Sequence, residues 1–242
     1  LWSRNIGDGE GRLGLRQHPV VSGDRIYAAD VEGDVVALEA GSGRQLWEAR
    51  TEMRMSGGPA LGDGTVVVGS LDGDVVAFNP DDGSERWRAR VSSEVIASPA
   101  VGNGVVVVRS NDGRMYGFGV TDGARRWVYD RGLPSLTLRG NGTPLITRGV
   151  VFAGYDNGQV VALRIDDGVQ IWEQTIAVPE GRTEIQRMVD IDGEIVVDTA
   201  EAYAAAYNGQ VLAISLEGGH PLWNRDVSSY SRLSIAVNLL LV

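Results

Sequence analysis

The chain has 242 residues, of which 43% are hydrophobic and 22% charged, a composition typical of a globular protein with a sizeable core. Its formal net charge of −10 argues against a nucleic-acid backbone or an anionic membrane surface as the binding partner. All 22 basic residues are Arg and there is no Cys, which excludes Schiff-base lysines, phosphate-loop lysines, thiolate nucleophiles, disulfides and Cys-based metal sites.

One motif recurs along the whole chain, and it ends at a tryptophan. A Gly stands four residues before each copy's Trp, and a second Gly stands fourteen residues before it. Another fourteen residues back lies a Pro, or Ile195 in the last copy. Five matches of this kind indicate a structural repeat. The repeat bodies are 19–47, 59–87, 99–127, 144–172 and 195–223, and their tryptophans are Trp47, Trp87, Trp127, Trp172 and Trp223.

Each body has the pattern of four short strands. A first strand follows the Pro and ends at a turn such as Gly62-Asp63-Gly64. Two β-branched runs, 66–70 and 74–78, are joined at Leu71-Asp72-Gly73, which predicts a hairpin. Asp81-Asp82-Gly83 then leads into a fourth strand that carries the Trp. Four antiparallel strands in about 40 residues predict an all-β fold, a β-propeller built of four-stranded blades.

The two ends of the chain do not match a complete body. Trp2 closes a partial blade, and a second partial blade opens at residue 234. A propeller ring closes in order to hide its strand edges. We therefore expect residues 1–242 to form a single β-propeller domain that is incomplete at both ends, with about five to six blades represented.

The repeated Trp has a structural role in this interpretation. We expect its large apolar ring to pack between neighbouring blades, against the small residue four positions after the hairpin Gly. That small residue is Ala37, Ala77, Gly117, Ala162 or Ala213.

The connectors between bodies differ in length, unlike the bodies. From Trp to the next Pro-equivalent the spacing is 12 in the second and third connectors, 17 in the first and fourth, and 23 in the fifth. In repeat proteins, extra length in particular copies maps to loops that often form the binding face. We therefore look for the function in the lengthened connectors.

The fourth connector contains an alternating run, LPSLTLRG (133–140). In a strand-like segment Leu136 and Leu138 would share one side, with Arg139 on the other. Leucines beside an Arg are plausible interface anchors. The alternative is that both leucines pack on their own blade, and the first connector has a similar Leu13-Gly14-Leu15-Arg16.

The fifth connector and the start of its body are strongly acidic. Residues 180–201 contain seven Asp and Glu against two Arg. Asp190 and Asp192 are candidates to bind a partner's Arg or Lys, or to hold Arg139 in place. The alternative is an acidic loop that is simply solvated.

The sequence predicts no catalytic residue, cofactor site or metal site. Its two histidines, His18 and His220, stand in different copies, each next to a Pro. The run 9–14 fits G-x-G-x-x-G but lacks the strand–helix context of a dinucleotide site. No apolar run approaches the roughly 20 residues of a membrane span.

The stretches ALEAGSGRQLW (37–47) and ALRIDDGVQIW (162–172) resemble the tryptophan-docking repeat of pyrroloquinoline-quinone (PQQ) propellers. Two further stretches, LPSLTLRG (133–140) and TEIQRMVDID (183–192), followed by AYNGQVLAI (206–214), resemble the BamB family. These are the propeller lipoproteins of the bacterial outer-membrane β-barrel assembly machinery. The two family-like stretches coincide with the two lengthened connectors.

The resemblance implies a non-enzymatic, eight-bladed scaffold at the periplasmic face of the outer membrane, part of the BAM complex. It implies attachment through an N-terminal lipid, although the lipid-bearing Cys is not in these residues. It also implies binding to the POTRA domains of the barrel insertase BamA, and it leaves contact with unfolded outer-membrane proteins open. The family's partner-binding residues carry over to Leu136, Leu138, Arg139, Asp190 and Asp192.

Two other functions are compatible with the same repeat. One is a PQQ-dependent quinoprotein dehydrogenase, although the adjacent cysteines expected of such enzymes are missing. The other is a ligand-sensing propeller domain of a larger receptor, because a fold alone does not define a function.

Overall fold

The structure is a computed structural model, and it describes residues 2–7, 17–131, 142–177, 191, 195–206, 210–227, 233–236 and 239–241. The regular secondary structure of these residues consists of strands, which form five four-stranded sheets and one two-stranded sheet. The chain divides into two compact units, Leu1–Val128 and Tyr129–Val242. In every four-stranded sheet the strands pair in chain order, as four consecutive short runs separated by turns predict.

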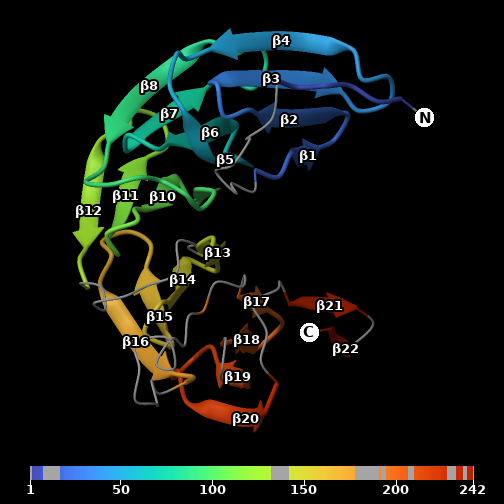
Figure 1. The fold of residues 1–242 in the computed structure, drawn as a ribbon. Coiled ribbons are helices and arrows are strands. Elements are labelled where there is room, and N and C mark those ends of the chain that lie inside the picture. The colour runs from blue at the N-terminus through green and yellow to red at the C-terminus, as the bar shows by residue number, and fades with distance from the viewer. Residues whose placement is uncertain are drawn as a thin grey trace, which may run out of the picture. The chain divides into compact units, whose positions relative to one another are not determined.

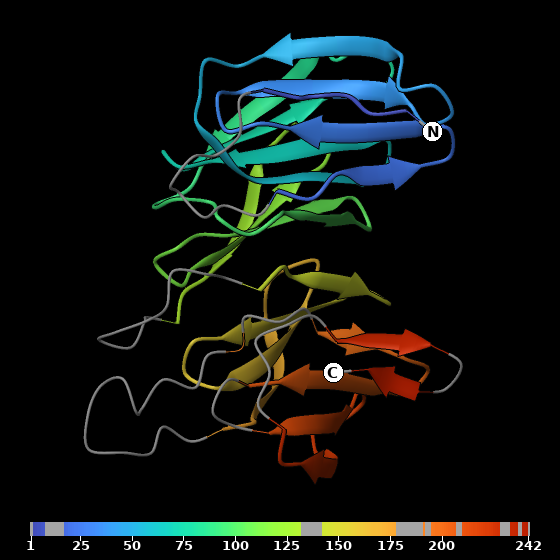
Figure 2. The same ribbon diagram turned by 45° about the vertical axis from the view of Figure 1, so that its right-hand side comes forward.

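The first unit carries three of these sheets, which Figure 1 shows in blue, teal and green. Figure 2 shows the four strands of the first of them side by side. Sheet 1 consists of β1 (Val20–Ser22), β2 (Arg25–Ala29), β3 (Asp34–Glu39) and β4 (Gln45–Arg50). Sheet 2 consists of β5 (Met55–Gly62), β6 (Thr65–Ser70), β7 (Asp74–Phe78) and β8 (Glu85–Arg90). Sheet 3 consists of β9 (Ala100–Gly102), β10 (Val105–Arg109), β11 (Met115–Gly119) and β12 (Arg125–Tyr129).

The second unit carries two four-stranded sheets and a hairpin. Sheet 4 consists of β13 (Leu145–Thr147), β14 (Val150–Tyr155), β15 (Gln159–Arg164) and β16 (Gln170–Thr175). Sheet 5 consists of β17 (Val196–Val197), β18 (Glu201–Ala205), β19 (Val211–Ser215) and β20 (Pro221–Arg225). The hairpin pairs β21 (Ser234–Ala236) with β22 (Leu239–Leu241), and Leu240 packs against Ala205 and Val211 of sheet 5.

The core lies between successive sheets of a unit. Val35 of sheet 1 and Val66 and Phe78 of sheet 2 share one buried cluster, and sheets 2 and 3 share another. In the second unit, Phe152 and Val160 of sheet 4 pack with Leu212 and other residues of sheet 5. The two central strands of each sheet are apolar on both faces because they are covered on both faces, a pattern that removes the strict alternation of a half-exposed strand.

The tryptophans connect one sheet to the next. Four indole N–H groups donate to a backbone carbonyl that lies three residues before the Gly of the following turn. These hydrogen bonds join Trp2 to Ala40 (3.0 Å), Trp47 to Pro80 (2.8 Å), Trp87 to Val120 (2.8 Å) and Trp172 to Leu216 (3.0 Å). Trp47, Trp87, Trp127 and Trp172 are buried, whereas the side chains of Trp2 and Trp223 are 39% and 41% exposed.

The turn glycine is the surface on which the indole rests. A Cβ on Gly83 would lie 2.5 Å from Cε3 of Trp47, and one on Gly219 would lie 2.5 Å from Cδ2 of Trp172. Gly43 and Gly123 stand in the same relation to Trp2 and Trp87. The contact partner in the next sheet is therefore a glycine of the turn before that sheet's own Trp.

The small residues expected at this contact have a different position. Ala37, Ala77, Ala162 and Ala213 are the cross-strand partners of the Trp in their own sheet. At Gly117, a Cβ would lie 2.2 Å from Cε2 of Trp127 in the same sheet. A small side chain is needed there because the indole lies across its own neighbouring strand before it reaches the next sheet.

Candidate partner-binding segments

The five residues that the sequence predicts to bind a partner lie outside the described residues. Leu136, Leu138 and Arg139 belong to the segment 132–141, and Asp190 and Asp192 belong to the segments 178–190 and 192–194. The structure does describe the residues from which these segments depart, and those residues are firmly held.

Arg131, which directly precedes the segment 132–141, forms a bidentate ion pair with Glu173 of β16. Its Nη1 lies 2.8 Å from Oε2 and its Nη2 lies 2.6 Å from Oε1 of that carboxylate. The guanidinium also lies over the ring of Tyr155, 5.6 Å from its centroid. A guanidinium with two parallel hydrogen bonds and a ring beneath it is fixed in orientation. The connector that holds Leu136, Leu138 and Arg139 therefore starts from a fixed point on sheet 4.

Arg131 and Glu173 each shift the pKa of the other in the direction that favours its ionised form. The hydrogen bond from Arg131 holds the pKa of the Glu173 carboxyl below its usual value of 4.5. Partial burial acts to lower the pKa of Arg131, but the hydrogen bond and charge of Glu173 outweigh it and the pKa is raised. Both groups are therefore ionised at neutral pH.

Ile191 is the described residue between the segments 178–190 and 192–194. It is fully buried in the core between sheets 4 and 5, and its Cγ2 lies where a Cβ on Gly154 would come within 2.4 Å. Val95 stands in the same relation to Gly69 of sheet 2, with a corresponding distance of 2.3 Å. Gly69 and Gly154 occupy the same place in their repeats, so Ile191 and Val95 are equivalent anchors.

This anchor locates the extra length of the fifth connector. The buried anchor stands eight residues after Trp47, as Met55, and eight after Trp87, as Val95, but nineteen after Trp172. The additional residues therefore lie between Trp172 and Ile191, with Asp190 at their end and Asp192 beyond them. The sequence signal that could have identified the anchor is the large apolar residue four positions before Pro59, Pro99 and Ile195.

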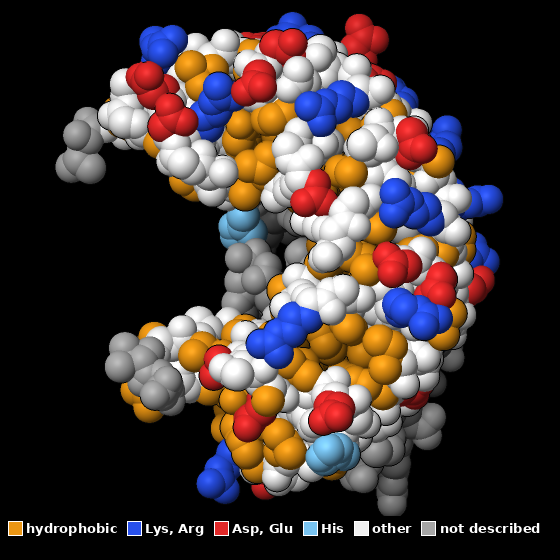
Figure 3. Space-filling view, turned by 180° about the vertical axis from the view of Figure 1, so that it is seen from behind, with side chains coloured by type: hydrophobic (Ala, Val, Ile, Leu, Met, Phe, Trp, Pro, Cys, Tyr) orange, Lys and Arg blue, Asp and Glu red, His pale blue; other side chains and the backbone are white. Residues whose placement is uncertain are grey.

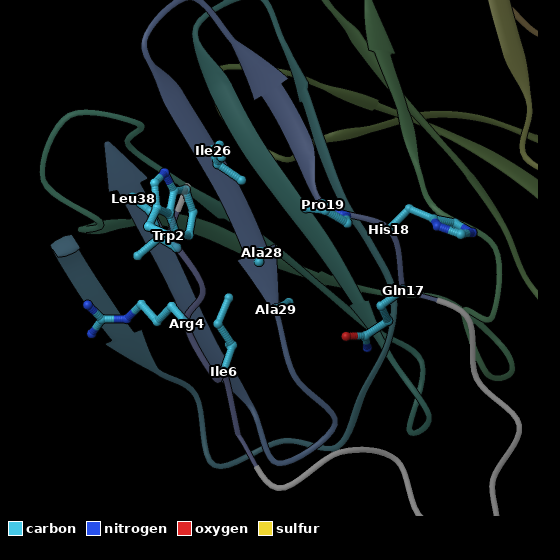
Figure 4. Close-up of a pocket in the computed structure, with 10 residues that line it drawn as sticks. All are labelled: Trp2, Arg4, Ile6, Gln17, His18, Pro19, Ile26, Ala28, Ala29 and Leu38. Carbon is cyan, nitrogen blue, oxygen red and sulfur yellow. The ribbon is translucent and has the colours of Figure 1, made fainter. Parts of the chain in front are cut away.

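A separate hollow of about 350 Å³ lies in the first unit (Figure 4). Trp2, Arg4 and Ile6 come from the N-terminal segment, and Ile26, Ala28 and Leu38 come from β2 and β3. Gln17 and His18 border it, and Nε2 of Gln17 is buried with no hydrogen-bond partner among the described residues. The lining is mainly apolar, and in the part of the chain that the structure describes no three His, Asp or Glu side chains gather as a metal site would require.

The face shown in Figure 3 carries acidic and basic side chains side by side, with hydrophobic ones reaching the surface between them. Such a mixed surface differs from the single-sign patches that bind nucleic acid or anionic lipid. Among the described residues, no helix is long and apolar enough to cross a membrane.

Comparison with known proteins identifies the family. The family model described as outer membrane protein assembly factor BamB matches residues 1–54 and 31–242, which together cover the whole chain. The chain belongs to the BamB family. The BamB of Pseudomonas aeruginosa is 56% identical over 229 residues, which are 95% of this chain and 60% of that protein. The BamB of Escherichia coli is 37% identical over 94% of this chain and 61% of that protein.

The crystal structure of BamB from Moraxella catarrhalis has a TM-score of 0.88 with this chain at 26% identity, and the match covers 95% of this chain and 70% of that one. The β-propeller prediction and the BamB resemblance are thereby confirmed. The BamB relatives that match are named assembly factors, and this chain spans about three fifths of their length.

Quinoprotein dehydrogenases share the fold at greater distance. The quinohemoprotein alcohol dehydrogenase of Comamonas testosteroni has a TM-score of 0.69 at 17% identity, over 88% of this chain and 43% of that one. An identity this low shows a common fold and nothing about activity.

Proposed function

We propose that this chain is part of a non-enzymatic scaffold protein of the outer-membrane protein assembly complex. The full protein would be anchored by a lipid and would act at the periplasmic face of the outer membrane. Its membership of the BamB family carries the proposal, because its relatives are named outer membrane protein assembly factors. The sheets of residues 1–242 would form a single propeller domain, since one repeat pattern runs through all of them.

The partner in this proposal is the barrel insertase BamA, bound through its POTRA domains. The binding residues would be Leu136, Leu138 and Arg139 in one lengthened connector and Asp190 and Asp192 in the other. Two observations support this choice. Both connectors exceed the minimal length, and both depart from residues that the core or an ion pair holds, namely Ile191 and Arg131. A binding loop that starts from a rigid scaffold loses less entropy when it binds.

The test is binding of purified BamA POTRA domains to the protein with Leu136→Ala and Leu138→Ala together. We expect binding to weaken by tenfold or more, as for truncated interface anchors that cost about 1.4 kcal/mol or more. The free energy of unfolding should change by only about 0.5 kcal/mol, as for surface sites.

The matched control is Val169→Ala with Ile171→Ala, which truncates two apolar side chains that are 51% and 50% exposed, in the turn before β16 and in β16. This control should bind normally. Equal loss of binding in both double variants would contradict the assignment of the site. A loss of stability of about 2–5 kcal/mol in the first variant would instead place Leu136 and Leu138 in the core.

A further inference from the structure

At the junction between sheets 1 and 2, an arginine of sheet 1 donates hydrogen bonds to a turn of sheet 2. Nη1 of Arg25 lies 2.9 Å from the carbonyl oxygen of Pro80 and 2.8 Å from Oδ1 of Asp81. The hydroxyl of Tyr27 donates to the same carbonyl at 3.3 Å, and the indole of Trp47 donates to it at 2.8 Å. The carbonyl of Pro80 thus receives three donors, and the carboxylate of Asp81 receives one.

The corresponding junction between sheets 4 and 5 lacks two of these donors. Repeat spacing and strand register place Val150 where Arg25 stands and Phe152 where Tyr27 stands. Leu216 and Glu217 stand in the places of Pro80 and Asp81, three and two residues before the turn Gly. Trp172 still donates to the Leu216 carbonyl, but neither Val150 nor Phe152 has a polar hydrogen to add.

A hollow of about 380 Å³ remains at this junction. Val150, Phe152, Ala200 and Leu216 supply apolar lining, and Glu217 borders it with an exposed side chain. Glu217 has no ion-pair or hydrogen-bond partner in the described part of the chain. The hollow therefore combines an apolar wall with a carbonyl oxygen and a carboxylate, the same acceptors that hold the guanidinium of Arg25 elsewhere in the chain.

Arg148 is the other charged group at this hollow, and its backbone is strained. It has a φ of +53°, at a turn position where sheets 2 and 3 have Asp63 and Asn103 with φ of +46° and +54°. Asp and Asn tolerate the left-handed region better than Arg does. Nη1 of Arg148 donates to the carbonyl of Thr199 at 2.6 Å, so this guanidinium is engaged at the edge of the hollow rather than with Glu217.

We propose that this hollow between sheets 4 and 5 is a second partner-binding site, which receives an arginine side chain exposed on another protein. The incoming guanidinium would donate to the Leu216 carbonyl and the Glu217 carboxylate, as Arg25 does to Pro80 and Asp81. Its aliphatic stem would lie on Val150 and Phe152. We expect arginine to be preferred over lysine because a guanidinium is more weakly hydrated than an ammonium and loses less solvation free energy against the apolar wall.

The probe for the test is N-acetylarginine N-methylamide, added to the protein with its Val and Leu methyl groups isotope-labelled for NMR. We expect saturable shifts of the methyl signals of Val150 and Leu216. The corresponding lysine derivative should bind more weakly. The corresponding glutamate derivative tests whether Arg148 instead makes the hollow an anion site, and it should not bind.

Three variants complete the test. Glu217→Gln removes the carboxylate charge and should weaken the arginine probe roughly threefold to tenfold. Asp81→Asn makes the same kind of change at the filled junction between sheets 1 and 2 and should leave probe binding unchanged. Val150→Arg supplies the missing guanidinium from within the chain and should abolish probe binding without lowering the melting temperature.

Three results would overturn the proposal: no saturable shifts up to the solubility of the arginine probe, unchanged affinity in Glu217→Gln, or preference for the glutamate probe. The proposal does not depend on the BamA assignment. Glu217→Gln should bind POTRA domains normally, whereas Leu136→Ala with Leu138→Ala should bind the arginine probe normally, so the two proposals fail separately.

Discussion

The indole of each docked tryptophan occupies space that only a glycine leaves free. Gly83 has a φ of +73°, and a Cβ there would strike the ring of Trp47. Gly64 has a similar φ of +66°, but no atom of the described residues lies within 4 Å of a Cβ built on it. Both positions therefore need a residue that tolerates a positive φ, but only Gly83 must also lack a Cβ to leave room for an indole ring.

This pair gives a prediction about the Trp contact. Gly64→Ala should destabilise the protein by about 1–2 kcal/mol, the cost of a left-handed alanine. Gly83→Ala should cost roughly 1–3 kcal/mol more, because Trp47 must also move away from its place. Urea unfolding of both variants measures the difference. Equal losses would mean that the indole adapts to the methyl group without cost.

A second residue-level prediction concerns the ion pair of Arg131 and Glu173. The pKa of Glu173 is lowered in the folded protein, so its contribution to stability is present above about pH 4.5 and is lost as pH falls through the folded-state pKa. Glu173→Gln should cost about 1–3 kcal/mol at pH 7, since it leaves the largely buried Arg131 without a carboxylate.

The measurement is urea unfolding at pH 7 and at pH 3, where the difference between Glu173→Gln and the unmodified protein should shrink. Glu85→Gln is the control, because Glu85 pairs with Arg88 in a more exposed ion pair in which both side chains are 41% exposed. It should change stability little at either pH. A constant difference across pH for Glu173→Gln would show that the carboxylate charge is not what Arg131 requires.

At the scale of elements, the connectors separate fold from function. The second and third connectors show that eight residues suffice from Trp to the buried anchor. Removal of residues 180–190, which include Asp190, would give the fifth connector this spacing while keeping both Trp172 and Ile191. We expect the shortened protein to keep its strand content and to lose affinity for BamA POTRA domains.

Circular dichroism and POTRA binding measure these two results. The same protein should still bind the arginine probe, because the deletion leaves Val150, Leu216 and Glu217 of the hollow between sheets 4 and 5 unchanged. Loss of the folded state would instead mean that the extra residues support sheet 5.

At the scale of the whole molecule, the fold could be predicted because each copy of the repeat carries the same local signals. Turn glycines, β-branched runs and the Trp recur at fixed spacing, so five copies support one interpretation. The packing partner of the Trp could not be predicted in the same way. Gly83 lies 36 residues beyond Trp47, and its role as a platform depends on how two sheets face each other.

The sites were harder to predict than the fold, for physical reasons. Connector length points to 132–141 and to the residues before Ile191, but length alone does not show which side chains contact a partner. The hollow at Val150 has no motif of its own. It becomes visible only when Val150 is compared with Arg25 and the acceptors around Arg25 are known.

The forward direction of the tryptophan contact has a consequence for biosynthesis. The indole of Trp47 can rest on Gly83 only after 36 more residues have been translated. A sheet whose successor has not yet folded therefore carries an uncovered aromatic ring, the kind of transiently exposed apolar surface that chaperones bind.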